Sequence, residues 1–119
     1  MKKISLTIPL FFLMAFSNAQ SSSEKEQMSK LIKENFELAD KQYSYMMTLI
    51  PAGKVPQSYD EKNKKLISKD IKWWCSGFYP GSLWYIYEQT GNDAMKKEAE
   101  RSMHLLEPNQ TNTGTHDLG

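Results

Sequence analysis

Two segments of the sequence carry side chains suited to contact or transform a ligand. The first is rich in aromatic rings and includes Trp73, Trp74, Tyr79, Trp84 and Tyr85. An aromatic ring offers a flat apolar face, which suits stacking against the C–H face of a sugar ring. Tyr79, Trp84 and Tyr85 fall at or inside an apolar helix, where core packing is the simpler interpretation. Trp73 and Trp74 precede that helix and are better placed to face an opening.

The second segment, residues 113–119, places His116 and Asp117 side by side between two glycines. An imidazole and a carboxylate are suited to acid–base catalysis. Adjacent side chains of an extended segment point to opposite sides, so these two are not a preassembled pair. From the residues alone, a solvated turn is the simpler interpretation. No nucleophile motif, paired metal-ligand helix or phosphate loop accompanies them.

Helical periodicity predicts the elements that must position these segments. Ser23 and Glu26 have capping-box spacing, and apolar residues then recur every three or four positions until Pro51, which predicts a long amphipathic helix. The stripe consists of Met28, Ile32, Phe36, Ala39, Tyr43, Met46 and Ile50. Residues 51–72 lose this period and are predicted to form a connecting loop without strands.

Two further helices are predicted after the loop. Residues 80–90 are apolar on nearly every side and end at Gly91, so this helix must be surrounded by others. Asn92 can cap a third helix, with one apolar stripe, that Pro108 stops. The order of one-striped, all-round apolar and one-striped helices predicts an all-α fold, with outer, inner and outer helices of a helical toroid.

The amino terminus predicts export. Lys2 and Lys3 precede a mostly apolar run that ends at Ser17-Asn18-Ala19, which is typical of a signal peptide over residues 1–19 with cleavage before Gln20. The run is shorter than the about 20 residues that a bilayer span needs, so no stable membrane anchor is expected. Residues 20–119 would then be the mature chain, in the periplasm or outside the cell.

Charge and cysteine content narrow the function classes. Fifteen basic residues against 14 acidic ones give a formal charge of +1, and no Lys/Arg block is present to follow a nucleic-acid backbone. Nucleic acid is therefore not an expected partner. Cys75 is the single cysteine, which excludes an internal disulfide framework and a cysteine-based zinc site.

Two motifs resemble those of glycoside hydrolase family 88, the unsaturated glucuronyl hydrolases. The first is WCSGFYPGSLW at residues 74–84, followed by YEQTG at 87–91, and the second is NTGTHDLG at 112–119. They occur in the family's order and at its spacing. Residues 56–58, PQS, also resemble an upstream family signature, with Gln57 where an arginine is expected. The resemblance covers about residues 26–119.

The resemblance implies the amino-terminal part of an (α/α)6 toroid with its active site in the mouth, and it implies no cofactor and no metal. Its substrates would be oligosaccharides with an unsaturated uronic acid at the non-reducing end, including glycosaminoglycan fragments. Water adds across the vinyl ether double bond, and the product rearranges until the glycosidic bond breaks. Asp117 matches one of two catalytic aspartates, while Trp74 and His116 match positions near the substrate. The second aspartate lies further along the family's sequence, so this chain alone is expected to be an inactive fragment.

Two alternatives remain open. A related unsaturated rhamnogalacturonyl hydrolase would share the toroid and the vinyl ether chemistry but meet a different neighbouring sugar. The chain could instead be a small non-catalytic helical module that binds a carbohydrate or a partner protein through its aromatic residues.

Overall fold

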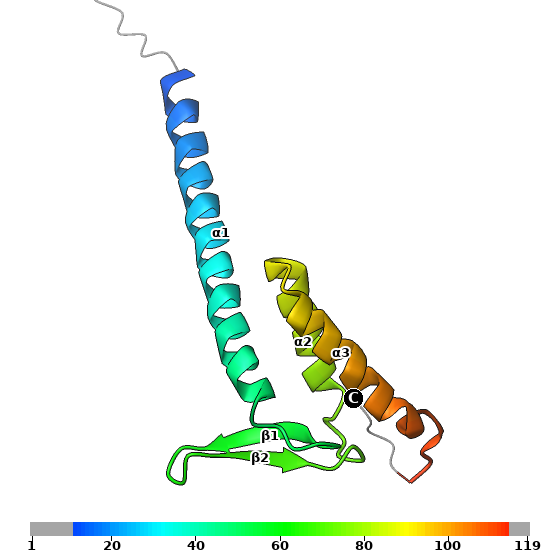
Figure 1. The fold of residues 1–119 in the computed structure, drawn as a ribbon. Helices are drawn as coiled ribbons and strands as arrows, with labels where there is room; N and C mark the ends of the chain where they lie inside the picture. Colours follow the sequence, from blue (N-terminus) through cyan, green and yellow to red (C-terminus); the bar gives the residue numbers. More distant parts are fainter. Residues whose placement is uncertain (1–10, 115–119) are drawn as a thin grey trace, which may run out of the picture. The chain divides into compact units, whose positions relative to one another are not determined.

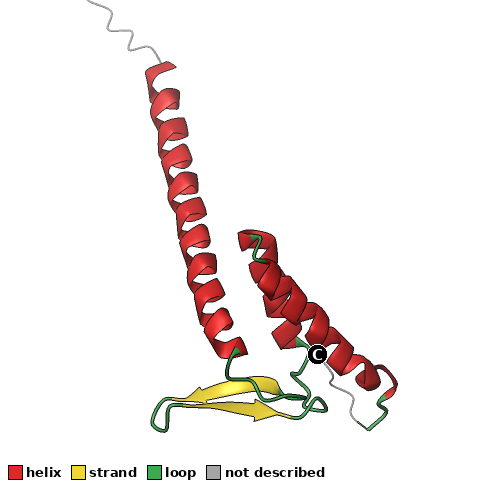
Figure 2. Ribbon diagram, viewed as in Figure 1, coloured by secondary structure: helices red, strands yellow, loops and turns green. Residues whose placement is uncertain are grey.

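The computed structural model describes residues 11–114, with side chains from Ser22 onward. It contains three α-helices, α1 (Phe11–Met47), α2 (Phe78–Thr90) and α3 (Asp93–Leu106), a short 3-10 helix η1 (Glu107–Thr111), and two strands, β1 (Val55–Asp60) and β2 (Lys65–Lys69) (Figures 1 and 2). The helical fold predicted from periodicity is confirmed, with a small sheet added to it. The chain divides into two units, Met1–Glu34 and Asn35–Gly119.

In the first unit, α1 already begins at Phe11, so the helix start predicted at Ser23 is wrong. Ser23 lies inside the helix and does not cap it. The stripe residues Met28 and Ile32 are exposed, at 56% and 45% of their surface. None of the described helices is both long enough and apolar enough to cross a membrane.

The second unit has a core in which α2 and α3 lie side by side (Figure 1). The buried core residues are Tyr79, Leu83, Ile86, Met95 and Ala99, and the carboxyl-terminal part of α1 packs against them through Phe36, Ala39, Tyr43, Met46 and Met47. This half of the predicted α1 stripe therefore does face the core.

The connection between α2 and α3 is short because two residues end one helix and start the next. Gly91 adopts a left-handed conformation with φ of 70° and donates its N–H to the Tyr87 carbonyl, as expected for a helix carboxyl terminus. Asn92 accepts a hydrogen bond from the Ala94 N–H through Oδ1, at 3.0 Å, and so caps α3 as predicted. The Asn92 Nδ2 also donates to Asp40 Oδ1 of α1, at 2.7 Å.

The prediction that residues 51–72 form a loop without strands is wrong, because they contain the antiparallel pair β1 and β2 (Figure 2). The strands are short, and β1 begins with Val55-Pro56, which masks a strand pattern. Pro56 is tolerated because a two-stranded sheet has only edge strands. At the tip, Asp60 accepts hydrogen bonds from the backbone and side-chain nitrogens of Asn63, and Lys64 adopts φ of 51°.

Candidate functional site

The aromatic segment enters α2 through a series of tight turns. The backbone N–H groups of Trp73, Ser76 and Phe78 donate to carbonyls three residues earlier, at 2.9 to 3.1 Å. These turns separate the two tryptophans: Trp73 is half-buried, whereas Trp74 leaves 57% of its surface exposed. Trp74 is therefore placed where a ligand can reach its ring.

A cavity of about 430 Å³, which we name the hairpin groove, lies between this segment, the hairpin and the end of α1. Its walls are mostly aromatic and apolar, with polar groups at Gln57, Ser58 and Ser82. The aromatic residues that line it are Tyr43, Tyr59, Trp73, Phe78 and Tyr79. A few polar groups in an apolar concavity are the usual composition of a small-molecule site.

A β-bulge contributes Gln57 to the hairpin groove. The strand register shifts between Pro56 and Ser58, so Gln57 has no partner in the register of β2. A bulge of this kind redirects a side chain, and Gln57 is the residue that replaces the expected arginine of the upstream signature. Its amide keeps hydrogen-bonding capacity at this position but carries no charge.

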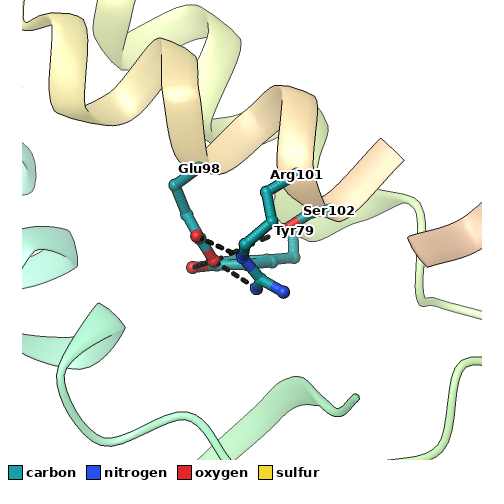
Figure 3. A network of polar contacts seen from close by, with 4 residues as sticks. All are labelled: Tyr79, Glu98, Arg101 and Ser102. Atoms are coloured by element: carbon teal, nitrogen blue, oxygen red, sulfur yellow. Dashed lines mark hydrogen bonds and ion pairs between the residues drawn. The ribbon is translucent and has the colours of Figure 1, made fainter. Parts of the chain in front are cut away.

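Tyr79, which lines the hairpin groove, belongs to a polar network with Glu98, Arg101 and Ser102 (Figure 3). The Tyr79 hydroxyl donates to Glu98 Oε1 at 3.0 Å, and Glu98 also accepts two hydrogen bonds from Arg101, at 2.6 Å each. Ser102 Oγ makes a longer contact with the same carboxylate, at 3.5 Å. The Tyr79 ring stacks on Tyr43, with ring centroids 6.3 Å apart, so both the ring and the hydroxyl of Tyr79 have a contact that fixes them.

The network shifts the pKa of each titratable member. Burial, followed by the charge of Glu98, raises the pKa of Tyr79 well above its usual range. Burial of Glu98 acts to raise the pKa of its carboxyl, but hydrogen bonds from Arg101 and Tyr79 outweigh it and lower the pKa below its usual value. Tyr79 therefore stays a neutral donor to an ionised acceptor, which is a positioning arrangement and not an acid–base pair.

A second cavity, of about 480 Å³, lies beside the start of α2 and the end of α3, and we name it the helix groove. Ser76, Gly77 and Pro80 line one side, and Asn109 and Gln110 of η1 line the other. Trp84 also lines it, and its Nε1 lies 3.2 Å from Met103 Sδ across to α3, which agrees with a packing role.

One hydrogen bond brings the two motif-bearing segments together. Asn109 Nδ2 donates to the carbonyl oxygen of Ile71, at 2.5 Å, so η1 is tied to the turns that carry Trp73 and Trp74. The chain continues from η1 through Asn112 toward residues 113–119. The structure thus brings the lead-in of the second motif to the lead-in of the first.

Of the sequence-predicted site residues, Trp74 is exposed but lines neither groove. His116 and Asp117 lie outside the described residues. Tyr85 was interpreted as core, yet 67% of its surface is exposed, so that prediction is wrong within this chain. Cys75, the single cysteine, is half-buried and lines the hairpin groove.

Sequence reasoning misses two roles, that of Tyr43 as a lining residue of the hairpin groove and that of Glu98 as the acceptor for Tyr79. Tyr43 was assigned to the core stripe of the first helix, and it does pack there while also lining the groove. Glu98 has no predicted role, although its i,i+3 spacing to Arg101 is a signal for a pair on one helix face. Within residues 11–114, no three His, Cys, Asp or Glu side chains lie close enough to hold a metal ion.

Comparison with known proteins links the chain to a glycoside hydrolase. It is 31% identical over 117 residues to an unsaturated glucuronyl hydrolase of Formosa agariphila. The match takes in 96% of this chain but only 28% of the length of that relative. No family model matches the chain, and no solved structure matches it either.

Proposed function

We propose that this chain is the amino-terminal part of an enzyme that removes unsaturated glucuronyl residues from the non-reducing end of lyase-generated oligosaccharides. The observation that carries the proposal is the 31% identity to a protein of that name, over nearly the whole chain. Because the chain spans 28% of that relative, the activity is proposed for the longer enzyme. Glycosaminoglycan fragments are the proposed substrates.

In the proposed reaction, water adds across the vinyl ether double bond of the unsaturated sugar. The hemiketal that forms then rearranges, and the glycosidic bond breaks. Asp117 would orient the acid–base partner and stabilise the charge that develops as the double bond is protonated. A second carboxylate, supplied by a further part of the enzyme, would donate the proton, since two neighbouring carboxylates with separated pKa values can divide these roles.

The arrangement around the two motifs supports a carbohydrate ligand. Trp74 presents an exposed ring of the kind that stacks on sugars, and His116 would lie beside the reacting sugar. The bond from Asn109 to the Ile71 carbonyl holds the two lead-in segments together, which favours one shared site. The toroid is proposed as the architecture of the longer enzyme, with α2 as an inner helix.

The test is turnover of an unsaturated glucuronyl disaccharide by the longer enzyme. Turnover is measured as the loss of the ultraviolet absorbance of the sugar's double bond. Asp117→Asn is expected to lower kcat by at least about a thousandfold, because one member of a catalytic carboxylate pair is lost. Asp93→Asn, at the exposed first turn of α3, is the matched control and is expected to retain wild-type turnover. Near-normal turnover by Asp117→Asn would remove Asp117 from the reaction.

A second candidate is a non-catalytic carbohydrate-binding module. The observation that favours it is the hairpin groove, whose aromatic walls belong entirely to residues 43–82 of this chain. Saturable oligosaccharide binding by this chain, with no turnover by the longer product of the same reading frame, would select the module. If the longer enzyme instead turns over only substrates in which rhamnose follows the unsaturated sugar, the rhamnogalacturonyl alternative is correct.

We also propose export, with removal of residues 1–19. Support comes from the basic start, the apolar run and the small residues before Gln20. Amino-terminal sequencing of the protein recovered from the periplasm or the medium is expected to begin at Gln20. Recovery of a cytoplasmic protein that retains Met1 would contradict this proposal.

A further inference from the structure

The hairpin and its flanks carry an unusual share of the positive charge. Residues 54–72 contain six lysines and three acidic residues, whereas the whole chain has a formal charge of +1. We name this stretch the basic hairpin. The rest of the chain is therefore net acidic, and a positive potential is concentrated on one small element.

Two of the three acidic residues are engaged in local interactions. Asp60 accepts hydrogen bonds from Asn63, and these lower the pKa of its carboxyl and fix the tip turn. Asp70 pairs with Lys54 at 3.7 Å and accepts the Lys72 backbone N–H. The five remaining lysines have no ion pair among the described residues, and they are Lys62, Lys64, Lys65, Lys69 and Lys72.

The strand pleat places part of this charge on one face. Along β2, Lys65, Ile67 and Lys69 are exposed, whereas the alternate residues Leu66 and Ser68 are half-buried. Residues two apart on a strand are about 7 Å apart. Two ammonium groups thus flank one apolar side chain, and Lys62 is exposed in the turn that precedes β2.

We propose that this face of the basic hairpin binds an anionic oligosaccharide that carries carboxylate or sulfate groups. Ile67, 40% exposed, offers an apolar contact for a sugar ring, and the lysines on either side pair with anionic groups of the chain. The choice of a glycan rests on the proposed function. A membrane surface fits less well, because a single isoleucine offers little apolar surface to insert.

This face lies apart from the hairpin groove. Of its four residues, Lys62, Lys65, Ile67 and Lys69, none lines that groove, whereas Leu66, which points the other way along β2, does. This face would therefore hold a portion of a polymer that lies outside the hairpin groove. Such a second contact raises effective local concentration without taking part in the reaction.

The test measures binding of a saturated hyaluronan decasaccharide, a carboxylate ligand without the reactive double bond, to the longer enzyme by titration calorimetry at low salt. The variant Lys62→Gln/Lys65→Gln/Lys69→Gln is expected to weaken binding about tenfold, from the loss of three exposed charge contacts. The control variant Lys25→Gln/Lys41→Gln/Lys97→Gln makes the same charge change on α1 and α3 and is expected to stay within about twofold of wild type.

A second variant separates charge from folding. Lys62→Arg/Lys65→Arg/Lys69→Arg keeps the charge and is expected to retain wild-type affinity. Equal weakening in the hairpin and control glutamine variants would overturn the proposal, as would absence of binding to both hyaluronan and a sulfated decasaccharide. Tighter binding to double-stranded DNA or to anionic vesicles of equal charge would also overturn it.

The same variants distinguish this proposal from the proposed function. In the longer enzyme, the glutamine hairpin variant is expected to turn over an unsaturated disaccharide normally, since none of the three lysines has a role in the proposed reaction. Asp117→Asn is expected to bind the saturated decasaccharide normally. Normal turnover with no decasaccharide binding would refute only the proposal that the basic hairpin binds a glycan. Decasaccharide binding with no turnover would refute only the proposed enzymatic function.

Discussion

Glu98 accepts hydrogen bonds from three other side chains, and only 13% of its side-chain surface is exposed. Replacement by glutamine keeps the size but removes the charge that holds Arg101. Because a half-buried charged acceptor is lost, Glu98→Gln is expected to lower the free energy of unfolding by about 2 kcal/mol at neutral pH. Glu100→Gln, exposed on the same helix, is the control and is expected to change the free energy by less than about 0.5 kcal/mol in urea denaturation.

The effect of Glu98→Gln depends on pH in a direction fixed by the lowered pKa of Glu98. A carboxyl whose pKa is lower in the folded than in the unfolded protein stabilises the fold above the unfolded value and loses that contribution as pH falls through the folded value. The usual value is 4.5. The difference in the free energy of unfolding between wild type and Glu98→Gln should therefore be largest above this pH and become smaller below it. A difference that stays constant down to acid unfolding would show that the charge is not involved.

Among the elements, the junction of α1 with the α2–α3 pair depends on Asn92, which caps α3 and contacts Asp40. Asn92→Ala removes both interactions and is expected to lower the free energy of unfolding by about 2 kcal/mol. Asn92→Asp keeps a capping oxygen but places a second carboxylate against Asp40. It is expected to destabilise, and the double variant Asn92→Asp/Asp40→Asn should recover most of the loss. Failure of that rescue would mean that the α1 contact adds no stability.

The same junction shows what local sequence can predict. Gly91 ends α2 by its left-handed backbone conformation, and Asn92 starts α3 by its short capping side chain, so these two residues predict the boundary between the helices. The sequence does not predict the hairpin, because Pro56, the polar residues of β1 and the five-residue β2 give neither a long alternation nor a Gly-containing turn. Its turn uses Lys64 at positive φ and an Asp60 side chain instead. The grooves join residues far apart in sequence, which no periodicity reveals.

At the scale of the whole molecule, α2 exposes aromatic rings that the other described residues do not cover. Phe78 and Tyr85 lie two turns apart and are 65% and 67% exposed. The chain is therefore expected to self-associate as its concentration rises, since exposed apolar patches drive contact. Sedimentation velocity measures this, and Phe78→Ser/Tyr85→Ser is expected to shift the chain toward monomer. Glu88→Ser on the same helix is the control and should leave association unchanged.

The apolar stripe predicted for α1 is buried along only part of its length. The carboxyl-terminal half of the α1 stripe meets the core, whereas Met28 and Ile32 remain exposed. A periodic stripe indicates that a face is suited to burial, but it does not name the element that covers it. Likewise, the roles of His116 and Asp117 come from resemblance, because their types and positions alone do not separate a site from a turn.

The hydrogen bond from Asn109 to the Ile71 carbonyl closes a loop of residues 71–109 that contains α2 and α3 and excludes both strands of the hairpin. A cut between Glu61 and Lys64 would therefore leave both partners of this bond on one piece. Insertion at that tip, or circular permutation through it, should preserve the helical pair, since exposed loop tips tolerate such changes. The tip turn is thus the position at which a reporter domain can be placed to follow this protein while the helical pair stays intact.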